Sequence, residues 1–242
     1  HDRSRTPAPQ KAIAAAHSIT PQMATTVADG TKISMENAVV ANATGFRVGK
    51  RGMYGPECSH VKEAPNLYPV NQMHKGGLVD YIHGAEPGPG VFVQGYNEHP
   101  TMQHYMKYLK MGEGPFYVFY TPYHLCHFEA PLTAARAVLF GDATVAPLAG
   151  PVCDVITIAK RDLKAGEILD GIGGYAYYGV LENFDISRAQ NLLPVGLAED
   201  CQLKNDIFKD QAITYSDVEI PDNRLCDRLR HEQNNHFAQS KV

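Results

Sequence analysis

Hydrophobic and polar residues follow the spacings of both helices and strands along the first 45 positions. The alanine-rich residues 10–17 favour a short helix. Residues 36–45, ENAVVANATG, predict a second helix that ends at Gly45. Between these helices, Asp29 and Gly30 separate two β-prone runs. This pattern predicts a hairpin, because glycine tolerates the positive φ of a tight turn.

The next hundred residues alternate between irregular and periodic segments. Residues 45–90 are rich in Gly, Pro and His, which is more typical of binding loops than of spacers. After them we expect a strand, a helix, a strand and a helix, over residues 90–96, 101–112, 115–125 and 131–141. Pro131 is predicted to lie in the first turn of the last helix, and Gly141 to end it.

The pattern changes after Gly141. Residues 141–151 form a Gly/Ala/Pro-rich linker, which indicates a domain boundary. Beyond it, short β-prone runs are divided by polar turns. In the final helix, Leu225 and Leu229 share one face and predict docking by a narrow apolar stripe. The expected fold is therefore α+β: a mixed α/β domain over 1–145, then a small, mostly β domain over 152–242 with a terminal helix.

Composition narrows the class of protein. The chain has 242 residues, of which 44% are hydrophobic and 20% charged, enough for one large core or two modest ones. Its net charge is −4, so neither nucleic acid nor a membrane surface is an expected partner. The sequence shows no apolar run of about 20 residues and no apolar core of a signal peptide, so we expect a cytosolic protein.

Two further features of the sequence bear on its class. The five cysteines are odd in number, widely spread and never paired as C-x-x-C, which argues against a disulfide framework or a structural zinc site. The chain starts with histidine rather than methionine, so we expect it to be part of something longer.

Gly171, Gly173 and Ala176 stand at the G-x-G-x-x-[GA] spacing of a dinucleotide-binding loop. Such a loop needs a buried strand before it and a helix after it, because the helix N-terminus holds the pyrophosphate. KAGEILD precedes the glycines and YYGVLENFDI follows them, and neither fits. The interpretation favoured here is a Gly-rich turn in a β domain.

The segment TPYHLCHFEAP concentrates candidate chemistry in Tyr123, His124, His127 and Glu129. Hydride transfer to a carbonyl needs a proton donor and a group that polarises oxygen, roles suited to His and Tyr. If residues 116–128 are extended, His124 faces away from His127 and Glu129, which disfavours a metal site made of this segment alone. The alternative is structural: one histidine is buried, the other solvated, and Glu129 caps the next helix.

Four other residues are candidates with equally plain structural alternatives. Lys75 is suited to bind a phosphate or carboxylate, or is an exposed loop lysine. Asp80 is suited to orient a lysine or hold a divalent ion, or is a turn residue. Asn42 fits a helix end, about 120° around the helix from Glu36. Arg136 reaches an acidic substrate or, as slightly favoured, pairs with Glu129.

Several segments resemble a known family. VITIAKRDLKAGEILDGIGGY, LLPVGLAE and QAITYSDVE resemble an SAF domain, the antifreeze-like β-clip module. Other blocks occur in the same order as in the deoxyxylulose-phosphate reductoisomerase-like (DRL-like) oxidoreductases, often labelled homoserine dehydrogenase-like. These blocks are ENAVVANATG, GMYGP, GGLVDY, PGVFV, GPFYVFYTPYHL, EAPLTAARAVL and RLCDRLRHEQ. The resemblance covers nearly all of residues 25–237.

The resemblance implies a catalytic domain followed by an SAF domain. Members of the family carry an NAD(P)-binding Rossmann domain ahead of these blocks, and it is missing here. The implied protein is an NAD(P)-dependent oxidoreductase acting on a small sugar-phosphate, polyol or hydroxy acid, with NAD(P)H held by that missing domain and this portion inactive alone. Mg²⁺ or Mn²⁺ is a further expectation, since reductoisomerase chemistry in the group includes a divalent ion. A homo-oligomer is expected by analogy.

The same resemblance assigns roles to the candidates. His124 is expected to donate a proton or hydrogen-bond to the substrate, Lys75 to meet its anionic end, and Asp80 or Glu129 to orient them or a metal. The expected substrate-binding residues are Glu36, Asn42, Tyr123 and Arg136. Two alternatives stay open: a non-catalytic module that binds carbohydrate or another subunit, and homoserine dehydrogenase itself, against which the SAF extension argues.

Overall fold

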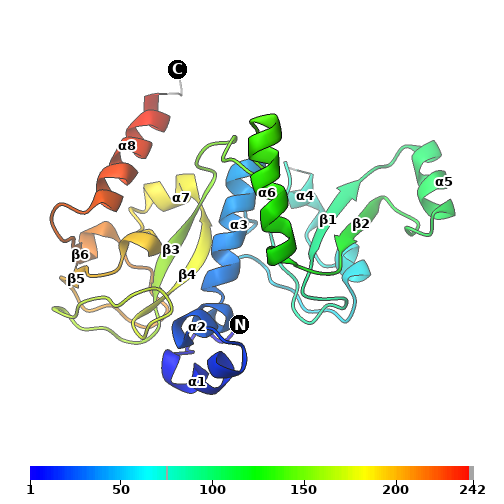
Figure 1. Cartoon of the computed structure of the whole chain (residues 1–242). Coiled ribbons are helices and arrows are strands. Elements are labelled where there is room, and N and C mark those ends of the chain that lie inside the picture. Colours follow the sequence, from blue (N-terminus) through cyan, green and yellow to red (C-terminus); the bar gives the residue numbers. More distant parts are fainter. Residues whose placement is uncertain (75, 240–242) are drawn as a thin grey trace. The chain divides into compact units, whose positions relative to one another are not determined.

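The structure, a computed structural model, describes residues 1–74 and 76–239 and divides into two compact units (Figure 1). The first unit comprises His1–Met53, Gly76–Val79 and the chain from Pro147 onward, and the second comprises Tyr54–Lys75 and Asp80–Ala146. The chain leaves the second unit inside the Gly/Ala/Pro-rich segment, whereas its first 53 residues pack with its C-terminal part. The catalytic and SAF-like domains expected over 1–145 and 152–242 stay a prediction.

The first unit begins with three helices, α1 (Pro7–Ala16), α2 (Pro21–Asp29) and α3 (Thr31–Thr44). The hairpin predicted at Asp29 and Gly30 is therefore wrong. Gly30 does adopt the positive φ that the pattern requires, 83°, but this residue ends α2 and begins α3. The helix predicted to end at Gly45 is confirmed, with that glycine also left-handed.

A buried antiparallel pair of strands is the centre of the first unit. β3 (Cys153–Ala159) pairs with β4 (Tyr177–Asn183), and α3 packs against both strands. Nearly every residue of the two strands is buried, including the polar Thr157, Glu182 and Asn183, so neither strand has a solvent-facing side. Their core contains Ile156, Ile158, Tyr178, Val180 and Leu192.

Short elements surround this pair. They are α7 (Phe184–Ala189), η2 (Val195–Leu197), β5 (Gln202–Leu203), η3 (Tyr215–Asp217) and β6 (Val218–Glu219). β5 pairs with β6, and isolated antiparallel bridges such as Ile158 to Ala212 connect the loops to β3. Helices together with small antiparallel sheets confirm the α+β class.

The terminal helix α8 (Leu225–Gln239) exists as predicted but is held differently. Leu225 and Leu229 are 57% and 54% exposed, so the predicted apolar stripe is wrong. Instead, Arg230 forms a two-pronged ion pair with Asp154 on β3, at 2.9 and 2.5 Å. Just before the helix, Arg224 donates to the Leu197 carbonyl at 2.9 Å. Planar guanidinium groups are suited to this kind of docking because they bind several oxygens at once.

The G-x-G-x-x-A loop at residues 171–176 is held by hydrogen bonds within the chain. Asp170 accepts hydrogen bonds from the Tyr175 and Ala176 backbone N–H groups, at 2.5 and 3.0 Å. Gly173 has a φ of 76°, and a Cβ there would lie 2.4 Å from the Gln22 carbonyl oxygen of α2. The loop is followed by strand β4 rather than by a helix. It is a turn, as the Gly-rich turn interpretation predicted, and it packs against α2.

The second unit is built around a two-stranded sheet. β1 (Val91–Tyr96) and β2 (Phe116–Thr121) pair antiparallel, with α5 (Pro100–Tyr108) between them in sequence. Before them lie η1 (Val61–Asn66) and α4 (Val70–Met73). The inner face of the sheet packs on η1 through Val118 and Phe92, with Val61 and Ala64 opposite. The strand and helix predicted over 90–96 and 101–112 are confirmed.

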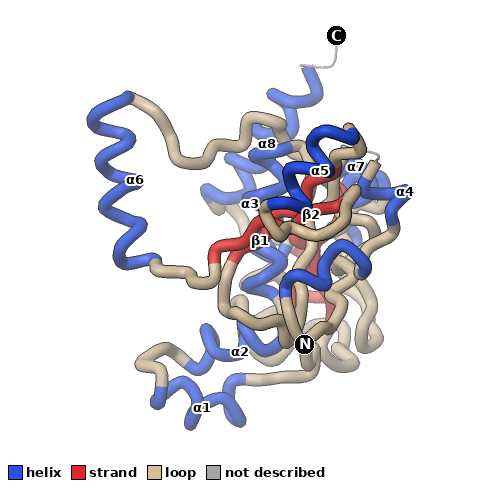
Figure 2. The backbone as a smooth tube through the Cα atoms, turned by 90° about the vertical axis from the view of Figure 1, so that its right-hand side faces the viewer, coloured by secondary structure: helices blue, strands red, loops and turns tan. Residues whose placement is uncertain are grey.

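The last helix of the second unit differs from its prediction. α6 (Cys126–Phe140) begins five residues earlier than expected, so Pro131 lies inside it rather than in its first turn, although Gly141 ends it as predicted. α6 stands between two loops (Figure 2), and no residue in it is buried. Its apolar side chains are exposed, among them Phe128 at 74%, Leu132 at 70% and Leu139 at 72%.

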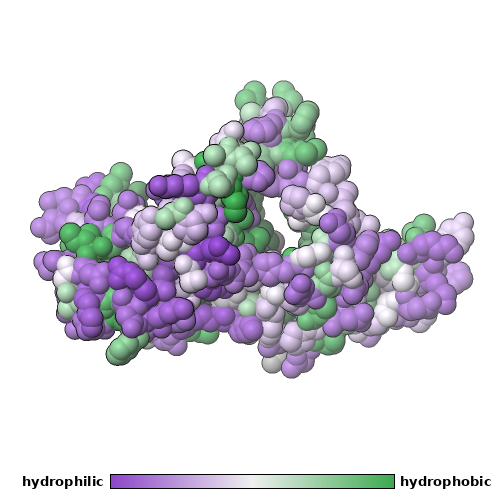
Figure 3. All heavy atoms as spheres, turned by 90° about the horizontal axis from the view of Figure 1, so that it is seen from below, coloured by the Kyte–Doolittle hydropathy of each residue, from purple (hydrophilic) through white to green (hydrophobic). Residues whose placement is uncertain are grey.

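In the described part of the chain, no helix combines the length and the apolar character needed to cross a bilayer. On the face drawn in Figure 3, hydrophilic residues predominate and hydrophobic residues emerge in scattered groups.

Candidate functional site

Three reactive side chains meet where β2 gives way to α6. His124 Nδ1 lies 3.7 Å from Glu129 Oε2, and His124 Nε2 lies 3.2 Å from Cys126 Sγ. The side chains of His124 and Glu129 are each 51% exposed, so solvent and small molecules reach them. A carboxylate on one ring nitrogen and a thiol on the other is an arrangement that can orient an imidazole for proton transfer. We call these three residues the His124 cluster.

The backbone explains why this cluster forms. Pro122 follows the last residue of β2 and has no N–H to extend the ladder, so the strand ends at Thr121. The chain then turns, and Leu125 accepts backbone hydrogen bonds from Phe128 and Glu129, at 2.9 and 3.0 Å, as the helix starts. The strand predicted over 115–125 is present as β2 but ends at Thr121, and residues 126–128 are helical. The turn between them brings Glu129 near His124 instead of onto the opposite face.

The other candidates near α6 take different partners. Glu129 lies in the first turn of the helix, but no side-chain cap is formed there, so the capping alternative is not what the structure shows. Arg136 pairs with Asp142, its Nε donating to Oδ2 at 2.9 Å, so the pairing with Glu129 favoured from the sequence is wrong. Tyr123 is 52% exposed, next to His124 in the chain.

Asp80 organises a turn of the second unit. Its Oδ1 accepts hydrogen bonds from the backbone N–H groups of Gly55 and Tyr81, at 2.9 and 2.8 Å, and its Oδ2 accepts one from Tyr54 at 2.8 Å. A carboxylate with three backbone donors fixes the loop at the start of the unit, which corresponds to the turn-residue alternative. Lys75, the other candidate of this region, lies outside the described residues.

Asn42 joins α3 to the edge of β3 in the first unit. Its Oδ1 accepts hydrogen bonds from the Val152 and Cys153 N–H groups, at 2.7 and 3.0 Å, and its Nδ2 donates to the Cys153 carbonyl at 3.2 Å. The side-chain amide of Asn42 thus pairs with the backbone at the start of β3 as a neighbouring strand would. Glu36, on the same helix, forms an exposed ion pair with Lys32.

The predicted residues therefore fall into separate groups. His124, Glu129, Tyr123, Asp80 and Arg136 belong to the second unit. Glu36 and Asn42 belong to the first. Cys126 is the member of the His124 cluster that the sequence prediction omitted, and its position two residues after His124, close to a helix start, was the available signal.

A metal site is not formed by the described residues. Within 1–74 and 76–239, no three His, Cys, Asp or Glu side chains lie where they could hold one ion. The His124 cluster supplies a nitrogen, a sulfur and a carboxylate. Glu129 lies on the Nδ1 side of the imidazole and Cys126 on the Nε2 side, so the three groups do not point at one common ion. The residues present do not fit Mg²⁺ or Mn²⁺, which prefer oxygen ligands.

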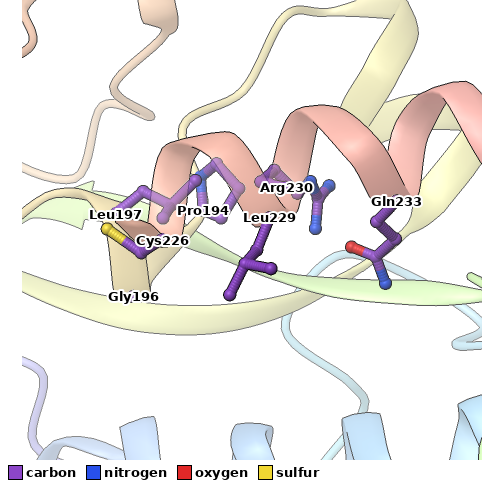
Figure 4. A pocket seen from close by; sticks show the side chains of 7 residues that line it. All are labelled: Pro194, Gly196, Leu197, Cys226, Leu229, Arg230 and Gln233. Atoms are coloured by element: carbon purple, nitrogen blue, oxygen red, sulfur yellow. The ribbon is translucent and has the colours of Figure 1, made fainter. Parts of the chain in front are cut away.

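A hollow of about 530 Å³ lies in the first unit between α8 and η2. It is lined by Leu197, Cys226, Leu229, Arg230 and Gln233, among others (Figure 4). The charge of Arg230 is taken up by Asp154, so this lining is effectively neutral. Another hollow of the first unit, about 350 Å³, is lined by Arg3, Lys50 and Arg51 together with Asp210 and apolar residues of β3 and β4.

Three thiols and several carboxyl groups have pKa values displaced from their ordinary values. Burial raises the pKa of Cys153 from its ordinary 9.0 to about 11. Burial likewise raises the pKa of Cys58 and of Cys201. The His60 backbone N–H, followed by the Ser59 hydroxyl, lowers the pKa of Glu63. None of these groups belongs to the His124 cluster, so none is assigned a chemical role here.

Comparison with known families identifies the class of protein. The family model described as "Oxidoreductase DRL, catalytic domain" matches residues 1–130. The chain belongs to this family, and it is therefore of an enzyme type, an oxidoreductase. The matched region contains seven of the eight predicted site residues, including His124 and Glu129, and leaves out Arg136. A comparison with curated proteins found no match.

Proposed function

We propose that this chain is the substrate-handling part of an NAD(P)-dependent reductase or reductoisomerase that acts on a small sugar-phosphate, polyol or hydroxy acid. The observation that carries the proposal is the match to the DRL catalytic domain over residues 1–130, which includes the whole His124 cluster. The nicotinamide, when bound, supplies the hydride. Because the G-x-G-x-x-A loop is packed against α2, the proposal places the cofactor outside the described residues.

In the proposal, the chain's own residues handle the proton. Reduction of a carbonyl leaves an oxygen that must gain a proton, and oxidation of an alcohol requires the reverse. Glu129 orients the imidazole through Nδ1, and Nε2 is the nitrogen that meets the substrate oxygen once Cys126 moves aside. Glu129 thus positions His124 as the carboxylate of a catalytic triad positions its histidine, here at an exposed site at the start of α6.

The test uses the protein encoded by the complete gene. It is incubated with reduced or oxidised NAD and NADP and a panel of sugar phosphates, polyols, hydroxy acids and homoserine, and the nicotinamide absorbance is followed. We expect turnover with one class, and a loss of kcat/KM on the order of 100-fold in His124→Gln. Turnover of homoserine as the best substrate, or no nicotinamide-dependent turnover at all, would contradict the proposal.

His127 provides the matched control. It is one residue beyond Cys126 on α6, is exposed like His124, and has no hydrogen bond or ion pair within the described residues. His127→Gln is therefore expected to leave kcat/KM nearly unchanged. Glu129→Gln is expected to shift the pH dependence of kcat, which a merely structural role on an exposed helix would not do.

A further inference from the structure

Helix α6 is exposed along its whole length. Every one of its 15 residues is exposed, and the apolar cluster around Val118 in the same unit forms without it. A helix of this length is only marginally stable in water by itself, and Pro131 removes one N–H from its hydrogen-bond ladder. The helix therefore needs a partner to pack on. All of α6 belongs to the second unit, so the pattern of residues along it does not depend on how the two units are placed.

One face of α6 carries an apolar stripe, which consists of Phe128, Leu132, Ala135 and Leu139. The steps between these residues alternate between four and three positions, the a/d spacing of helices that pair through a seam. Val138, which flanks the stripe, is 83% exposed. Each large side chain of this face buries roughly 100 Å² in an interface, so the face supplies about half of the roughly 800 Å² that each partner contributes to a standard interface. Polar residues beside the stripe supply the rim.

The stripe is complementary to itself when two helices run antiparallel. A two-fold axis at its middle places Phe128 of one copy against Leu139 of the other. The same axis places Leu132 against Ala135, so each large side chain at the centre meets a small one, as close packing requires. A parallel pair would instead set Leu132 against Leu132 and leave a gap between the two Ala135 side chains.

The charged residues of α6 fit the same antiparallel pairing. Glu129 and Arg136 each follow a stripe residue directly, so both flank the stripe on the same side. In an antiparallel pair these flanks face each other, which brings Glu129 of one copy to Arg136 of the other, twice by symmetry. Within one copy, Arg136 donates through Nε and Nη2 to Asp142 Oδ2, and its guanidinium has further N–H groups for a second carboxylate.

We propose that two copies of this chain associate through α6, antiparallel and about a two-fold axis. The pairing sets the start of one α6, with its His124 cluster, beside the end of the other α6. Association therefore covers part of the Glu129 side chain, which is 51% exposed in one copy. The inference does not rest on the proposed function, because association requires no redox step.

Sedimentation equilibrium of the full chain, and of the protein encoded by the complete gene, tests the association. Both are expected at twice the mass of one copy at micromolar concentration. Leu132→Asp places a charge in the seam and is expected to raise the dissociation constant about 100-fold or more. Leu109→Asp is the matched control, because Leu109 lies in the same unit outside α6 and is 62% exposed, and it should change the constant less than twofold. A monomeric full chain, a monomeric gene product, or a dimer that Leu132→Asp leaves intact would each overturn the inference.

Cysteine cross-linking tests the orientation of the two helices. In a background of Cys126→Ser and Cys226→Ser, which removes the exposed thiols, chains with Leu132→Cys and with Ala135→Cys are mixed and oxidised. Disulfides are expected chiefly between unlike chains. Cross-links chiefly between like chains would show a parallel pair and overturn the inference.

Exchange of the charges tests the contact between Glu129 and Arg136 without relying on the stripe. Glu129→Arg and Arg136→Glu are each expected to weaken association about tenfold, because like charges then meet twice in each dimer. An equal mixture of the two variants restores opposite charges at both contacts and is expected to form the mixed dimer at nearly the wild-type affinity. A mixture that associates no more tightly than either variant alone would overturn the inference.

Discussion

The buried ion pair between Lys160 and Asp29 gives the sharpest test of how the first unit is held together. The two side chains are 2% and 0% exposed, and Lys160 Nζ lies 2.8 Å from Asp29 Oδ2. Lys160 also donates to the Gly174 carbonyl at 2.8 Å, which ties the Gly-rich loop to the same point. Among the described residues, Lys160 is the cation that pairs with Asp29, whose other oxygen accepts a hydrogen bond from the Thr31 N–H.

Replacing Lys160 with methionine should therefore leave a buried carboxylate without compensation. Removal of one partner of such a pair costs about 3–5 kcal/mol of unfolding free energy. The double variant Lys160→Met with Asp29→Asn removes both charges and keeps an oxygen for the Thr31 N–H that Asp29 Oδ1 accepts at 2.9 Å. We expect the double variant to recover most of the loss, with about 1 kcal/mol remaining for the unpaired Gly174 carbonyl.

Urea unfolding followed by circular dichroism measures both variants. Lys164→Met is the matched control, because Lys164 makes an exposed pair with Asp206, and its free energy of unfolding should scarcely change. The reasoning is refuted if Lys160→Met is no more destabilising than this control, or if the double variant is as unstable as the single one.

Three other predictions follow from individual contacts. Asn42→Ala should lower the unfolding free energy by about 2–3 kcal/mol, because it leaves the Val152 and Cys153 N–H groups and the Cys153 carbonyl without their partner. A change in KM without this loss of stability would contradict the structural role. Cys153 should resist iodoacetamide at about pH 8 while the exposed Cys126 reacts, because the thiolate is the reactive form. The Cys153 thiol has a pKa of 9.0 in the unfolded chain and of about 11 in the folded one. The stability that the buried thiol contributes is therefore complete below pH 9.0 and is lost as the pH rises from 9.0 to about 11. A homo-oligomer that uses the exposed apolar face of α6 should dissociate in Leu139→Asp, as sedimentation would show, and an unchanged sedimentation coefficient would exclude that helix as the contact.

The sequence correctly predicted the helix that ends at Gly45 but misread Asp29 and Gly30 for a physical reason. The β-branched threonines around them suggest strands, yet Thr25 and Thr26 donate their hydroxyls to the Pro21 and Met23 carbonyls, at 2.8 and 2.7 Å, and so fit within a helix. The tie between Asp29 and Lys160 lies far outside any local window. Tertiary contacts therefore decided the conformation here, whereas Gly30 itself was recognised correctly as a left-handed position.

The sequence predicted which residues form the candidate site but not how they are arranged in space. His124 and Glu129 were singled out from their residue types, but an assumed strand placed them on opposite faces. The missed signal was Pro122, which stops the ladder and allows the turn. Arg3, by contrast, was beyond prediction from the sequence, because its position over Tyr178 depends on chain segments that meet only in the folded unit.

The central claim is that an oxidoreductase of the DRL family uses His124, positioned by Glu129, to move the substrate proton. The most direct measurement is the pH dependence of kcat for the protein encoded by the complete gene, compared among wild type, His124→Gln and His127→Gln. The account predicts that one limb of the wild-type profile disappears in His124→Gln and persists in His127→Gln. An unaltered profile in His124→Gln, with kcat preserved, would contradict it.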